Sequence, residues 1–251
     1  MVKLYQQAVA EFVGAFALIF IGAGTLITLP LSVPQNQADA AGLVAAALAH
    51  GLVIGVMVAA LGHISGGHFN PAVTVGVWVA GKIESARVVV YIVSQLAGAT
   101  AAALLLRFAL PEQLWRFTAL GTPAVQTRIV SDAKALLIEG MLTFFLVFVV
   151  FAVAVDDRGA FSKVAGLPIG LVITFDVFMG GALTGAAMNP ARHFGPALVG
   201  GGFTTNAWIY YVGPLAGGVL AAVIYYFVFL RSREVAAQRE DTPVGGGPDN
   251  A

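Results

Sequence analysis

Six long stretches of the chain are almost free of charge, and short polar segments separate them. They cover residues 12–38, 40–61, 88–106, 133–155, 164–183 and 206–230. Each is close to the ~20 apolar residues that a helix needs to cross a bilayer. The pattern therefore predicts an all-α membrane protein with six transmembrane helices, the first of which ends near Pro30.

Two shorter apolar stretches each begin with the motif Asn-Pro-Ala, which places a polar residue and a helix breaker inside apolar surroundings. Asn is a favoured cap, and Pro at the first helical position gives up an N–H that has no partner there. We therefore expect two re-entrant half-helices of about 15 Å each, so that two end to end fill a core of ~30 Å. The motif is Asn70, Pro71 and Ala72 in the first copy, and Asn189, Pro190 and Ala191 in the second.

The two halves of the chain repeat each other at fixed offsets. The sequence Gly-Leu-Val-Ile begins 19 residues before Asn70 and again 19 residues before Asn189. Each half contains three spans, an odd number, so the two copies must be inverted across the membrane. We expect one transmembrane domain over 1–230, with repeats at about 5–110 and 131–230, and a disordered cytoplasmic tail over 231–251.

Composition and charge narrow the class of protein. The chain is 59% hydrophobic and 10% charged, whereas soluble domains carry about 25% charged residues. Its net charge is zero, which gives no sign of a nucleic-acid partner, and it has no Cys for thiol chemistry. Of the 13 Lys and Arg residues, eight fall on the side of the N-terminus, four on the other and one, Arg192, in a half-helix, which predicts cytoplasmic termini.

Inverted half-helices would meet by their N-termini at the centre of a pore. Their positive dipole ends and the amide donors of Asn70 and Asn189 would repel a cation there and tolerate a neutral, hydrogen-bonding molecule. Arg192 is the third residue of the second half-helix. Because a charge at that depth needs water or a partner, we expect it to face the pore near the outer mouth.

From Glu11 to about Leu230 the sequence resembles the major intrinsic protein family, the aquaporins and glycerol facilitators. The resemblance implies an aquaporin-like right-handed bundle and a passive channel for water that excludes protons and ions. It also implies a homotetramer in the lipid bilayer. An enzyme is not expected, because the sequence shows no nucleophile–base pair, phosphate loop or metal-ligand set, and we expect neither a cofactor nor a metal. The motifs that carry the resemblance are the two Asn-Pro-Ala boxes, Ser65-Gly66-Gly67-His68 before the first, Arg192 after the second, and Ala10-Glu11-Phe12 in the first span.

The resemblance also implies a selectivity filter formed by His50, Val177, Ala186 and Arg192. This set is similar to that of the plant tonoplast subgroup, so we expect a filter wider than in strict water channels, open to ammonia or other small neutral solutes. A broader glycerol, urea or peroxide facilitator is the alternative, although His193 stands where glycerol facilitators have Asp. Outside the channel class, a secondary transporter and a membrane scaffold remain open.

The other buried polar residues allow two readings each. Glu11 and Glu139 either relay protons or, as the resemblance implies, brace the re-entrant loops. Asp176 either faces the pore or binds loop donors, and the second is favoured; in a transporter it would be the coupling residue.

Two histidines, His193 and His68, are further candidate modulators of the pore. A neutral, hydrogen-bonded His193 is favoured over a pH switch, and His68 is expected at the cytoplasmic mouth rather than in a metal pair. The sequence does not decide which residue of the 107–132 loop reaches Arg192; Gln126 and Thr127 are candidates. We expect the cell (plasma) membrane as the location.

Overall fold

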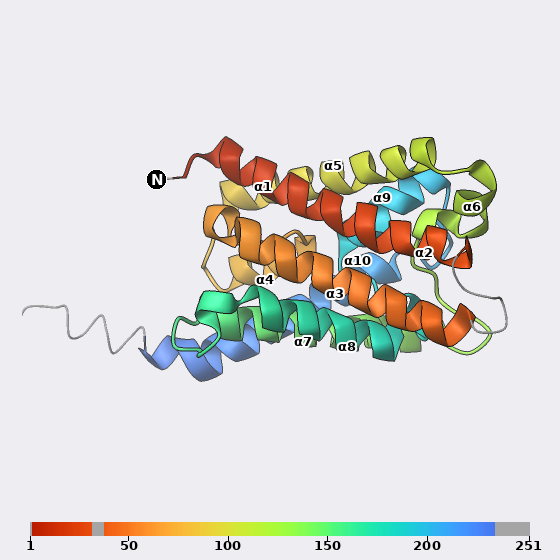
Figure 1. The fold of residues 1–251 in the computed structure, drawn as a ribbon. Coiled ribbons are helices and arrows are strands. Elements are labelled where there is room, and N and C mark those ends of the chain that lie inside the picture. Colours follow the sequence, from red (N-terminus) through yellow and green to blue (C-terminus); the bar gives the residue numbers. More distant parts are fainter. Residues whose placement is uncertain (1, 32–37, 234–251) are drawn as a thin grey trace, which may run out of the picture.

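Residues 2–31 and 38–233 are described by the computed structural model, and this part of the chain contains helices and no strand (Figure 1). Within it, six helical spans are long and apolar enough to cross a membrane. They are Leu4–Leu31, Ala40–Ser65, Ser85–Ala109, Asp132–Val155, Gly166–Thr184 and Ile209–Arg233. The predicted fold class and the number of spans are thereby confirmed.

The helices are labelled as in Figure 1. The first span is built from α1 (Leu4–Ala17), a π-helical segment (Leu18–Ala23) and α2 (Gly24–Thr28). The other spans contain α3 (Ala38–Ser65), α5 (Ser85–Ala109), α7 (Asp132–Val150), α8 (Gly166–Thr184) and α10 (Ile209–Tyr225). The two half-helices are α4 (Pro71–Val79) and α9 (Pro190–Gly200), and a short α6 (Glu112–Phe117) lies between the halves.

Several span boundaries differ from the sequence prediction, among them those of the first span, the C-terminal tail and the loop between the halves. The first span begins at Leu4 rather than residue 12, because Glu11 is fully buried and hydrogen-bonded inside the helix, so its charge does not mark water. The last helical span runs to Arg233, three residues into the predicted tail; the rest of that tail, 234–251, lies outside the described residues. The loop expected over 107–132 begins three residues later, because α5 ends at Ala109, and it contains α6.

Close helix contacts depend on glycine at repeat-related places. A Cβ on Gly217 of α10 would collide with the carbonyl of Gly140 on α7, and a Cβ on Gly98 of α5 with the carbonyl of Phe12 on α1. The small residues predicted for close packing in the third and sixth spans therefore do lie at helix contacts. A third extensive contact joins α3 to α8, one helix from each half.

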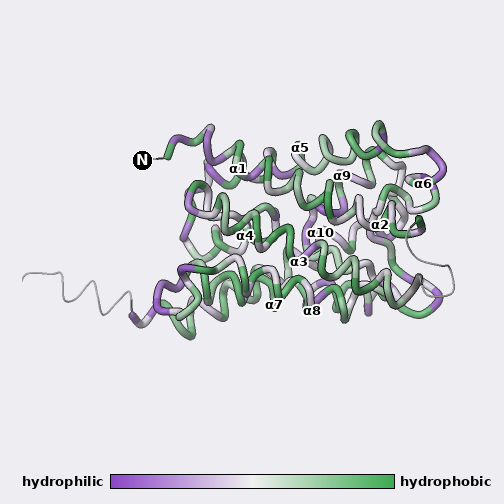
Figure 2. Tube along the Cα trace, viewed as in Figure 1, coloured by the Kyte–Doolittle hydropathy of each residue, from purple (hydrophilic) through white to green (hydrophobic). Residues whose placement is uncertain are grey.

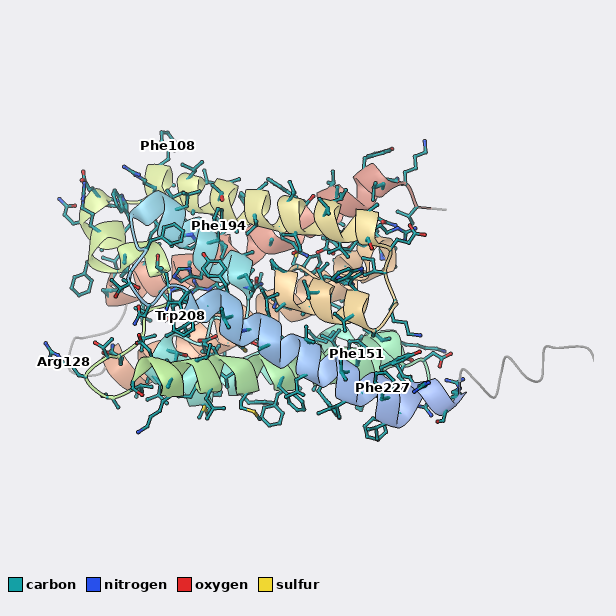
Figure 3. All side chains as sticks on the ribbon, turned by 180° about the vertical axis from the view of Figure 1, so that it is seen from behind. Phe108, Arg128, Phe151, Phe194, Trp208 and Phe227 are labelled. Carbon is teal, nitrogen blue, oxygen red and sulfur yellow. The ribbon has the colours of Figure 1, made fainter. Side chains whose placement is uncertain are left out.

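The outer surface of the bundle is apolar, and the polar residues gather at its two ends and in the interior (Figure 2). Leu52, Val89 and Leu137 are more than half exposed on the helix faces. Aromatic side chains stand at both ends: Phe108 and Phe227 project from opposite ends of the bundle in Figure 3. This distribution is typical of a protein whose solvent is lipid.

Candidate functional site: a central pore

The two half-helices start as the sequence predicts. Asn70 caps α4 by accepting a hydrogen bond from the backbone N–H of Ala72 at 2.8 Å. Asn189 caps α9 by accepting one from Ala191 at 2.9 Å. In both cases Pro occupies the first helical turn, so the predicted caps are confirmed.

Each capping asparagine also binds the loop of the opposite repeat. The Nδ2 of Asn70 donates to the carbonyl of Met188 at 2.9 Å, and the Nδ2 of Asn189 donates to the carbonyl of Phe69 at 3.0 Å. The N-termini of α4 and α9 are thus held face to face. Each side-chain amide has a second N–H, and both side chains line the central cavity.

In the first repeat, Glu11 organises the loop that precedes α4. Its Oε1 accepts hydrogen bonds from the Ser65 hydroxyl at 2.6 Å and the His68 N–H at 3.0 Å, and its Oε2 accepts one from the Phe69 N–H at 2.7 Å. The loop needs this support because Phe69 has a left-handed backbone with φ of 49°.

In the second repeat, Glu139 makes the same three bonds. It accepts from the Thr184 hydroxyl at 2.6 Å, the Ala187 N–H at 3.0 Å and the Met188 N–H at 2.8 Å. Met188 is left-handed as well, with φ of 52°. Both acids therefore make the contacts of a brace and face fixed donors, and equivalent residues of the two halves supply these donors.

The cavity between the half-helices is narrow. The space open to water measures about 40 Å³, against the ~10–15 Å³ that one water molecule needs on that measure, so only a few waters fit. Most of the lining is aliphatic. Its polar members are His50, His68, Asn70, Asn189 and Arg192.

Arg192 is almost fully buried and is fixed at two points. Its Nε donates to Nε2 of His50 at 3.0 Å, and its Nη1 donates to the carbonyl of Gly121 at 2.8 Å. His50 lies 2.7 Å from the carbonyl of Ala46 through Nδ1. Because a carbonyl only accepts, Nδ1 carries the proton and Nε2 is the acceptor, so both imidazole nitrogens are already engaged.

Gly121 is the loop residue that sequence reasoning missed. Gln126 and Thr127 were candidates for the residue that reaches Arg192; the backbone N–H of Gln126 donates to the carbonyl of Leu183 at 2.9 Å, and it is the Gly121 carbonyl that binds the guanidinium. Gly121 has φ of +68° in a tight turn after α6. A turn that ends on a glycine can be recognised in the sequence. The direction in which the carbonyl of that glycine points, however, depends on how the loop packs.

Of the two remaining residues predicted for the filter, one lines the cavity and the other does not. Ala186 lines the cavity beside His50 and Arg192. Val177 is buried on α8 and is outside the lining set. The structure therefore brings three of the four predicted filter residues together around the lumen.

The three candidate modulators have different surroundings. His68 lines the cavity, with Nδ1 3.1 Å from the Thr74 hydroxyl. His193 is fully buried outside the lining set, stacked on Tyr210 with ring centroids 4.5 Å apart. Asp176 is also buried outside the lining, and in the described part of the chain its Oδ2 has no hydrogen-bond partner. The favoured bond from Asp176 to loop donors is not found for that oxygen.

Comparison with known proteins decides the family. The family model described as "Major intrinsic protein" matches residues 1–225. The chain belongs to the major intrinsic protein family.

Relatives within this family are aquaporins. The chain is 41% identical over 229 residues to Aquaporin TIP1-2 of Zea mays, covering 91% of this chain and 87% of the relative. It is 42% identical over 236 residues to Probable aquaporin TIP3-2 of Arabidopsis thaliana, covering 90% and 85%. Members of the family are channels, so the chain is an integral membrane channel and not an enzyme.

A solved structure shares the fold. The aquaglyceroporin from Plasmodium falciparum superposes with a TM-score of 0.78, covering 93% of this chain and 100% of that one, at 22% sequence identity. At that identity the likeness concerns the fold alone, which is the major intrinsic protein fold.

Proposed function

We propose that this member of the major intrinsic protein family is a passive water channel that excludes protons and other ions. The observation that carries the proposal is the meeting of α4 and α9 by their N-termini, with the amides of Asn70 and Asn189 at the junction. Two positive dipole ends and two amide donors oppose a cation there. A water molecule can accept from those donors, and a lumen that holds only a few waters passes them one after another.

We extend the proposal to small neutral solutes such as ammonia. Ala186 contributes little volume to the filter, and His50 has no free donor for a solute because both ring nitrogens are engaged. A solute at this point meets the guanidinium of Arg192 and an imidazole whose two nitrogens are already bonded. Such a filter discriminates by size and by the ability to accept a hydrogen bond.

We also propose a homotetramer in the lipid bilayer with both termini in the cytoplasm. The start of the first span and the end of the last span lie at the same end of the bundle (Figure 1), as an even number of crossings requires. The cell membrane stays the predicted location; the similarity to TIP-type relatives makes internal membranes the alternative, and fractionation against markers of both separates the two.

The test of transport uses purified protein in liposomes under an impermeant osmotic gradient, followed by stopped-flow light scattering. Shrinkage much faster than in empty liposomes, with a weak temperature dependence and no need for an ion gradient, supports the channel. Flux that saturates and requires an ion gradient would support a secondary transporter, and the absence of flux with vesicle clustering would support a scaffold. Swelling under an inward ammonia or urea gradient measures the solute range.

A further inference from the structure

Gly22 lies in the π-helical segment Leu18–Ala23 of the first span and packs directly against the filter histidine. A Cβ placed on Gly22 would be 2.6 Å from both Nε2 and Cδ2 of His50. Carbon atoms in good contact are ~3.5–4.0 Å apart. The imidazole therefore occupies the space that any side chain at position 22 would need.

His50 has little freedom to move away from such a side chain. Its Nδ1 is held by the Ala46 carbonyl at 2.7 Å, and its Nε2 receives the Nε–H of Arg192 at 3.0 Å. Arg192 is in turn fixed to the Gly121 carbonyl at 2.8 Å. A group that pushes the ring away from the first span therefore acts on the guanidinium and on the width of the lumen.

At the equivalent place of the second repeat the helix is α-helical rather than π-helical, and it carries no glycine. The 128 residues that separate Glu11 from Glu139 also separate Gly22 from Val150, and the 119 that separate the two capping asparagines also separate His50 from Ile169. Val150 and Ile169 both line the cavity. A β-branched residue is thus accommodated where the partner is aliphatic, and glycine stands where the partner is an imidazole.

We propose that Gly22 is a positioning residue of the selectivity filter, which sets the width of the lumen by letting His50 lie back against the first span. The inference rests on the proposed channel function and adds a residue outside the four expected filter positions. It acts through His50, so its effect must depend on the imidazole. A purely structural role for Gly22 in the bulge of the helix would not.

The test combines Gly22→Ala with His50→Ala and the double variant, and Gly24→Ala is the matched control. Among the described residues, a Cβ on Gly24 would meet only Leu106 Cδ2, at 3.2 Å. We expect Gly22→Ala to lower osmotic water permeability about tenfold, the equivalent of ~1.4 kcal/mol in barrier height, and Gly24→Ala to leave it unchanged. In the His50→Ala background, Gly22→Ala should have no further effect. An equal loss in both backgrounds, or no loss in either, overturns the proposal.

A second readout does not depend on transport. The chain has four histidines, so the imidazole nitrogens of His50 can be assigned by ¹⁵N NMR with His50→Ala as reference. Gly22→Ala should shift the Nε2 resonance as the Arg192 bond is lost, and Gly24→Ala should not; an unshifted resonance in Gly22→Ala refutes the inference. Wild-type liposomes no more permeable than empty ones, together with the expected NMR shift, would instead count against the proposed channel function.

Discussion

The brace at Glu139 gives the sharpest test of how the pore is held open. In Glu139→Gln one carboxylate oxygen becomes an NH₂ group, which cannot accept. The N–H of either Ala187 or Met188 then loses its partner in a buried place, at a cost of about 1–3 kcal/mol. For a chain of 150–250 residues, each kcal/mol corresponds to roughly 2–4 °C in Tm, so we expect Tm to fall by about 2–12 °C.

The effect should extend to transport, because Met188 also supplies the carbonyl that holds Asn70 across the pore. Thermal unfolding in detergent and water permeability in liposomes should both decline in Glu139→Gln. The control is Glu112→Gln, since Glu112 is 62% exposed and pairs with Arg116 on the surface of α6; such pairs contribute about 0–1 kcal/mol. If Glu139→Gln matches the control in Tm and in permeability, the brace is not what holds the loop.

Three further predictions follow from other sites. Wild-type channels should be insensitive to mercurials because the chain has no Cys, and Ala186→Cys should make water flux mercury-sensitive, since Ala186 lines the lumen. Gly121→Ala should lower water permeability and Tm, because φ of +68° disfavours any side chain and the turn positions the acceptor for Arg192; a loop variant that transports normally would contradict this. The Arg158 guanidinium lowers the pKa of the Asp156 carboxyl in the turn after the fourth span. This pair should therefore stabilise the fold at pH values above the ordinary Asp pKa of about 3.9. Its contribution to stability should be lost as the pH falls below that value. Asp156→Asn should then flatten the dependence of Tm on pH between about 5 and 2, and an unchanged pH profile would argue against the pair.

The features that the sequence predicted correctly depend on local chemistry or on repetition. The Asn-Pro starts of α4 and α9 follow from capping rules, and the inverted repeat follows from equal offsets along the chain. Glu11 and Glu139 could be paired by position, although only the structure shows that each accepts two backbone N–H groups. The charge of Glu11 misled the prediction of where the first span begins, because charge marks water only when it is not buried and paired.

What the sequence did not reveal depends on contacts between distant segments. The acceptor for Arg192 comes from a turn whose direction is fixed by packing, so Gly121 could not be chosen over Gln126. Gly22 appeared as one small residue among many in an apolar span, and its contact with His50 appears only once the helices are assembled. Spacing places Val177 on the correct helix, but the rotation of α8 decides whether its side chain reaches the lumen.

The central claim is that opposed half-helix termini admit water and exclude protons, and one preparation can test both parts. Liposomes containing the protein and a pH-sensitive dye would be followed in the stopped-flow instrument, first under an osmotic gradient and then under a pH gradient with valinomycin present to dissipate charge. The account predicts water flux far above that of empty liposomes, together with a proton flux equal to theirs. A proton flux that rises with the amount of protein, or water flux no greater than in empty liposomes, would contradict it.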